Sequence, residues 1–171
     1  MDESEKTSAP NSAHEERNLK SYKGKNLPTT GIKFYILESY FDSLDDHDIS
    51  DDDADRVTDF VIHLSQQGFK NLEGRNKRSN EALPDDKRFM SKAQFAIEYK
   101  LFHYHVGIDN YEGDEHGDKK SKYLVHYSFD HVENAAKVIC VNYHPNFILP
   151  KIQQINSLVE DEYEKVTDEV D

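Results

Sequence analysis

Histidines alternate with aromatic and aliphatic residues along three segments in the second half of the chain: 101–108, 123–129 and 136–143. Each segment has the composition of a β-strand, and successive side chains of a strand point to opposite faces of its sheet. If the strands are neighbours, five polar residues share one face: His103, His105, His126, Asn142 and His144. The opposite face is aromatic and aliphatic, and we expect it to pack against a helix.

Clustered histidines favour acid–base chemistry, because imidazole titrates near neutral pH and a pair can remove one proton and supply another. Cleavage of RNA by its own 2′-hydroxyl needs two such transfers and a cation near the phosphate, with no metal or other cofactor. The residues that we nominate for catalysis are His126, His144, His103, His105 and Tyr127, the last supplying a hydroxyl or a stacking ring. The candidates for binding RNA are Arg75, Lys77, Arg78 and Lys92.

Two other interpretations of these histidines stay open. Two histidines at i and i+2 of a strand, with a third on a neighbouring strand, are a plausible zinc arrangement. A carboxylate from the following loop, at Asp109, Glu112 or Asp114, would then complete the site. Alternatively, the histidines are only the solvent-facing half of an amphipathic sheet.

The first half of the chain predicts a strand followed by a helix. Residues 32–41 have the aromatic and β-branched content of a strand, and 42–49 form an acidic turn. Ser50 and the aspartates after it are typical of a helix start, and Gly68 is typical of a helix end. Between them, one apolar stripe has the i, i+3, i+4, i+7 spacing: Val57, Phe60, Val61 and Leu64.

The remaining segments connect these elements. Residues 70–88 are basic and lack periodicity, which predicts a long loop. Residues 89–99 are ambiguous between strand and helix. The polar stretch 110–122 predicts a loop, 131–134 a tight hairpin and 152–159 a short closing helix.

Composition limits the architecture and the compartment. The chain of 171 residues favours one domain at 28–158, with a disordered tail at 1–27 and an acidic tail at 159–171. No apolar run is long enough to span a bilayer, and the first residues lack the apolar core of a signal peptide. The single cysteine, Cys140, fits a small buried hydrophobe in a reducing compartment. We expect a cytoplasmic protein that does not bind a membrane.

The order of elements, strand, helix, long basic loop and three antiparallel strands, resembles the RelE/ParE superfamily of bacterial toxins. The local similarity is strongest in 123–129 and 137–144, which look like that family's penultimate and last core strands. The resemblance implies an α+β fold, with an antiparallel sheet of about four strands and one main helix on one face. Where the family has a helical hairpin after its first strand, we expect a single helix here.

The resemblance also implies a function. It points to an mRNA interferase, the endoribonuclease toxin of a toxin–antitoxin system, whose partners are a cognate antitoxin and mRNA, free or on the ribosome. His126 and His144 are then the first catalytic candidates, and His103 and His105 occupy places of basic catalytic side chains. The net charge of −13 favours the alternative, a non-catalytic acidic interaction or inhibitor module on the same fold.

Overall fold

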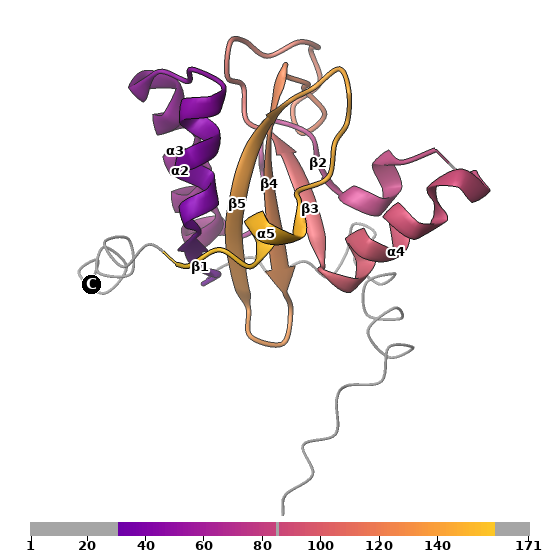
Figure 1. Ribbon diagram of the computed structural model, residues 1–171. Helices are drawn as coiled ribbons and strands as arrows, with labels where there is room; N and C mark the ends of the chain where they lie inside the picture. The colour runs from indigo at the N-terminus through magenta and orange to yellow at the C-terminus, as the bar shows by residue number, and fades with distance from the viewer. Residues whose placement is uncertain (1–30, 85, 160–171) are drawn as a thin grey trace, which may run out of the picture.

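The computed structural model describes residues 31–84 and 86–159, which form a five-stranded mixed sheet with helices around it (Figure 1). The strands are β1 (Lys33–Ile36), β2 (Asn76–Arg78), β3 (Leu101–His105), β4 (Tyr123–Asp130) and β5 (Ala135–Tyr143). Their order across the sheet is β1-β5-β4-β3-β2. β1 runs parallel to β5, and the other neighbouring pairs are antiparallel.

The described part of the chain contains four α-helices: α2 (Glu38–Asp46), α3 (Asp51–Gln67), α4 (Met90–Glu98) and α5 (Ile152–Ile155). Two short 3-10 helices precede α4, at Ser79–Ala82 and Lys87–Phe89. Within these residues, no helix combines the length and the apolar character needed to cross a membrane.

The long helix α3 confirms the sequence prediction for 50–68. The Ser50 hydroxyl accepts a hydrogen bond of 3.2 Å from the Asp53 amide, and Gly68 ends the helix with a φ of 61°. The predicted stripe is almost fully buried and faces aromatic side chains of β3 and β4. The Phe60 ring, for example, stacks on Tyr104 with centroids 4.3 Å apart. Burial of this stripe therefore fixes α3 on the apolar face of the sheet.

The face that carries the histidines is buried as well. It holds a second apolar cluster made of Leu37, Ala96, Leu101, Ile139 and Cys140. Residues of α4 and of the chain after β5, including Phe95, Leu149 and Ile155, pack against this cluster. In Figure 1, α5 crosses in front of β5, and α4 lies at the right. The expectation of a solvent-facing histidine face is thus replaced by a sheet covered on both sides.

The helix α2 continues the edge of the sheet where β1 ends. The Ser39 hydroxyl donates a hydrogen bond of 2.7 Å to the Ile139 carbonyl oxygen. The Val141 amide donates one of 2.8 Å to the Ser43 hydroxyl. Both serines are buried, so this helix satisfies backbone groups of β5 that no strand pairs.

Replacing Ser43 by alanine tests this arrangement. The variant leaves the amide of Val141 buried without an acceptor, which we expect to cost about 1–3 kcal/mol of unfolding free energy. Urea unfolding followed by circular dichroism measures the loss. Ser65→Ala is the matched control, since the Ser65 hydroxyl only donates within α3, to the Ile62 carbonyl oxygen. Equal stabilities of the two variants would contradict the assigned role of Ser43.

A β-bulge changes the alternation expected for β5. His126 pairs with Cys140 and Tyr127 pairs with Val138, so Ile139 is the extra residue. Ile139 therefore packs beside Cys140 on the histidine side, although strict alternation places it on the opposite face with Val141.

Several other expectations need correction. The sheet has five strands and is mixed, because β2 forms within the predicted loop 70–88 and β1 is parallel to β5. The predicted strand 32–41 stops at Ile36, and α2 occupies 38–46. The ambiguous segment 89–99 is mainly α4, so a single main helix is also wrong. The expected tails, 1–27 and 159–171, lie outside the described residues except for Val159.

Candidate functional site

Four histidines gather around one phenylalanine on the covered face of the sheet. His103 lies opposite His126 in the β3–β4 ladder, with ring centroids 6.4 Å apart. His105 lies two residues further along β3, and its ring centroid is 5.4 Å from that of His144. The ring of Phe147 lies 4.9 Å from His103 and 5.7 Å from His126. The structure thus brings together all four histidines that the sequence nominated.

Phe147 reaches the cluster because the chain turns back over the sheet after β5. The segment between Pro145 and Pro150 carries it across β4 and β3, where it covers His103 and His126. This ring also lines a groove of about 340 Å³ with Leu83, Lys92 and Phe95. The cover isolates the inner histidines from solvent.

Burial makes the three inner histidines neutral. His103 and His105 are each 3% exposed, and His126 is fully buried. Desolvation lowers the pKa of His126 to about 3, with a further contribution from His144. Burial is also the main cause that lowers the pKa of His105 to about 4 and the pKa of His103 well below its ordinary value. None of these three can exchange a proton readily near pH 7.

The hydrogen bonds of these imidazoles differ. Nδ1 of His105 lies 2.8 Å from the Ser121 amide nitrogen and 3.2 Å from the Ser121 carbonyl oxygen, so the backbone of Ser121 holds this ring in place. Nδ1 of His103 lies 3.4 Å from the Ser79 hydroxyl. In His126, both ring nitrogens are buried without a hydrogen-bond partner. A buried polar group without a hydrogen-bond partner lowers the free energy of unfolding, so His126 destabilises the folded protein.

His144 is the histidine that remains accessible, and it lies just past the end of β5. Its side chain is half-buried, and desolvation followed by the charge of Lys120 lowers its pKa. The charge of Lys120 also lowers the pKa of His105, as does that of Arg75. Lys77 lies opposite His103 in the β2–β3 ladder and acts on it in the same way. At the margin of the cluster, Lys120 thus acts on the neutral imidazole of His144, whereas Arg75 acts on His105 and Lys77 acts on His103.

The cations nominated from the sequence occupy different places. Arg75 forms a two-point ion pair with Asp118, at 2.6 and 2.8 Å. Lys77 is exposed, and among the described residues it makes no ion pair. Arg78 is almost buried, pairs with Glu81 and lies opposite Phe102, on the other face. Lys77 is therefore the nominated cation that is most available to a ligand of the cluster.

Two further nominated residues lie away from the histidines. Lys92 is exposed beside the groove of Phe147, with its ammonium 5.7 Å from the ring centroid of Phe89. Tyr127 is fully buried on the opposite face, and its hydroxyl donates a bond of 2.7 Å to Asn76. Its position among the core aromatics assigns Tyr127 a packing role.

Sequence reasoning did not nominate Lys120 for the site. Lys120 belongs to the basic run 119–122, which leads directly into β4, but the polar stretch 110–122 that contains it predicts only a loop. Residues 147–150 are expected from the sequence to cap the sheet, and Phe147 does so. The sequence does not show that its ring lies against His103 and His126.

The zinc interpretation is not supported by this geometry. Among the described residues, no group of three or more His, Cys, Asp or Glu side chains has the arrangement of a metal site. Asp109, one of the proposed loop ligands, instead forms an ion pair with Lys122 at 2.8 Å.

Comparisons with known proteins leave the family open. No protein-family model matches the chain, and neither a curated protein nor a solved structure matches it.

Proposed function

We propose that the protein is a metal-free endoribonuclease whose reactive group is His144. The observation that carries this proposal is a half-exposed imidazole, kept neutral by burial and by Lys120, at the margin of a cluster bordered by Lys77 and Arg75. A neutral imidazole can accept a proton, and neighbouring ammonium groups can bind a phosphate. Chain cleavage by the 2′-hydroxyl of RNA needs this combination.

The proposed reaction is an internal transfer at phosphorus. His144 takes the proton of the 2′-hydroxyl, and the 2′-oxygen attacks the adjacent phosphorus. The bond from phosphorus to the 5′-oxygen breaks, and the Lys120 ammonium gives its proton to that leaving oxygen. Lys77 offsets the charge on the phosphate oxygens. The products are a 2′,3′-cyclic phosphate and a free 5′-hydroxyl.

The inner histidines have a supporting role in this proposal. His105 contacts the ring of His144 and is itself held by Ser121. His103, His126 and Phe147 form the layer behind this pair. We propose that these four residues position His144 and exclude water. The three histidines do not take up a proton near pH 7, because burial lowers their pKa values.

Cleavage of a single-stranded RNA by the purified protein, with EDTA present, tests this function. We expect His144→Ala to slow cleavage about 100-fold or more, as loss of a general base does. Lys120→Ala is expected to slow it about 100-fold or more as well, because it removes the group that gives a proton to the leaving oxygen. Each reaction is run with and without ribosomes.

Lys87→Ala is the matched control, because Lys87 is exposed in the 3-10 helix before α4, away from the histidines. It should cleave at the normal rate. A folded His144→Ala variant that cleaves as fast as the unchanged protein contradicts the assignment of His144.

The relation to RelE/ParE toxins stays a hypothesis. Two consecutive helices, α2 and α3, follow β1, and this supports the resemblance because a helical hairpin follows the first strand in that family. A cognate antitoxin is the partner that the resemblance implies. Suppression of growth on expression, relieved by a neighbouring gene, would support both proposals.

A second candidate is the acidic interaction module, with no catalysis. The segment 38–59, which forms α2 and most of α3, contains ten acidic residues and one basic residue, Arg56. Such a surface can cover a basic partner. Absence of RNA cleavage under every condition, together with salt-sensitive recovery of basic proteins, would favour this candidate.

A further inference from the structure

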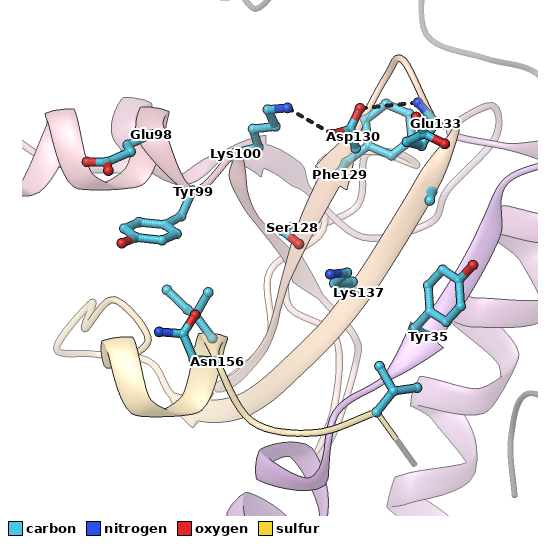
Figure 2. A pocket seen from close by; sticks show the side chains of 13 residues that line it. Tyr35, Glu98, Tyr99, Lys100, Ser128, Phe129, Asp130, Glu133, Lys137 and Asn156 are labelled. Carbon is cyan, nitrogen blue, oxygen red and sulfur yellow. Dashed lines mark hydrogen bonds and ion pairs between the residues drawn. The ribbon is translucent and has the colours of Figure 1, made fainter. Parts of the chain in front are cut away.

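A cleft of about 600 Å³ opens on the histidine side of the sheet, at the opposite end from His144 (Figure 2). It lies between the hairpin end of β4 and β5, the edge strand β1, the end of α4 and the helix α5. Ser128, in the floor of the cleft, is six residues after Lys122, which directly precedes β4. The Lys122 carbonyl oxygen accepts a hydrogen bond from the His144 amide, so Lys122 marks the position of His144. At about 3.4 Å per residue, the two places are roughly 20 Å apart. The cleft is therefore separate from the proposed catalytic centre.

The floor of the cleft presents a cation beside a hydroxyl. Ser128 and Lys137 lie directly opposite each other in the β4–β5 ladder, so their side chains stand next to each other on this face. Within the described residues, neither side chain makes a hydrogen bond or an ion pair. An ammonium and a hydroxyl held side by side are well suited to bind phosphate oxygens.

The walls carry two aromatic rings and an amide. Figure 2 shows Tyr99 and Asn156 on one side of the cleft and Tyr35 on the other, with Ser128 and Lys137 between them. Their three polar tips also lack hydrogen-bond partners among the described residues. Rings of this kind stack on a nucleic-acid base, and the amide can bond to the edge of a base.

An ion pair between Lys100 and Asp130 holds the rim of the cleft in place. Lys100 donates to Asp130 at 2.8 Å, and Asp130 also accepts from the amides of Val132 and Glu133. Because Asp130 is engaged in this way, it does not neutralise Lys137. The carboxylates of Glu98 and Glu133 also line the cleft, and they can accept hydrogen bonds from sugar hydroxyls.

We propose that this cleft binds a nucleotide, with the phosphate on Lys137 and Ser128, the base against a tyrosine ring and the ribose hydroxyls on a rim carboxylate. The volume falls within the range of about 300–1,000 Å³ found for small-molecule sites. The nucleotide comes either as a free monophosphate or as one unit of an RNA strand, and the test below separates these sources.

The first experiment titrates the isotopically labelled full-length protein with adenosine monophosphate and follows the backbone amide signals by NMR. We expect shifts at Tyr35, Tyr99 and residues 128–137. Adenosine, which lacks the phosphate, should bind about tenfold more weakly, because the charge-assisted contact to Lys137 is missing. Inorganic phosphate alone should shift Ser128 and Lys137 without shifting the tyrosines.

Lys137→Ala should weaken binding of adenosine monophosphate about tenfold, whereas Lys70→Ala, in the exposed turn that follows α3, should not change it. Lys137 is exposed, so this variant should fold normally. The proposal is overturned if millimolar adenosine monophosphate shifts no amide of the cleft, or if Lys137→Ala binds it as tightly as the unchanged protein.

A short, non-cleavable oligonucleotide identifies the source. If it binds about tenfold or more tightly than the monophosphate, and depends on Lys137, the natural ligand is an RNA strand. Equal affinities identify the free nucleotide. His144→Ala should bind adenosine monophosphate normally, so failure of the proposed nuclease activity and failure of this site give different results.

Discussion

Lowering the pH from about 7 to about 5 is expected to destabilise the protein, because the unfolded chain takes up protons that the buried histidines cannot. In the folded protein, burial holds the pKa of His105 at about 4 and that of His126 at about 3, against an ordinary value of 6.5. Between pH 6.5 and these values, only the unfolded state binds the protons. Each histidine then removes about 1.4 kcal/mol of stability for every pH unit of acidification.

The variant His126→Leu separates this effect from other effects of acid. Leucine has a similar size and no ring nitrogens, so it removes two buried unsatisfied groups and one proton-binding site. At pH 7 we expect the variant to be as stable as the unchanged protein or more stable. Its loss of stability on acidification should be smaller by about 1.4 kcal/mol per pH unit.

Urea unfolding at pH 7, 6 and 5 measures these slopes. This range lies above the ordinary pKa of the carboxylates, so their protonation contributes little. Ile139→Val is the matched control, since it is buried on the same face and cannot titrate. It should lower stability by about 1 kcal/mol at every pH. A slope that is unchanged in His126→Leu would show that His126 is not buried and neutral as described.

The sequence was sufficient for elements whose signal is local. The helix 50–68 combined a capping serine, a terminal glycine and a complete apolar stripe, and α3 follows these signals closely. The three central strands were also found, and their adjacency in the sheet confirms the grouping of His103, His105 and His126 on one face.

The errors arose where a tertiary contact determined the local structure. Residues 38–46 have aromatic side chains that favour a strand, but Ser39 and Ser43 bind the edge of β5 only from a helix. The bulge at Ile139 likewise depends on pairing with β4. The cover of the histidine face comes from Phe147 and α4, and alternation along a strand says nothing about what covers either face.

Gly74→Ala is expected to displace the edge strand that carries Lys77. A Cβ atom at Gly74 would lie 1.9 Å from the carbonyl oxygen of His105 and 3.0 Å from the Tyr111 ring. The first of these neighbours is backbone of β3 and cannot rotate away. The segment leading into β2 must therefore shift, which breaks the bond of 2.9 Å from the His105 amide to the Arg75 carbonyl oxygen.

We expect this substitution to cost about 3 kcal/mol, the upper end of the range for overpacking, and also to reduce RNA cleavage by moving Lys77 away from the histidines. Gly113→Ala is the control: its Cβ would meet open space, and only the φ of 98° opposes it, at about 1–2 kcal/mol. Urea unfolding ranks the two variants. If Gly74→Ala is no less stable than Gly113→Ala, β2 does not approach β3 as closely as described, and Lys77 loses its assigned place opposite His103. If it is less stable yet cleaves RNA normally when folded, the fold stands and the role of Lys77 in binding phosphate is wrong.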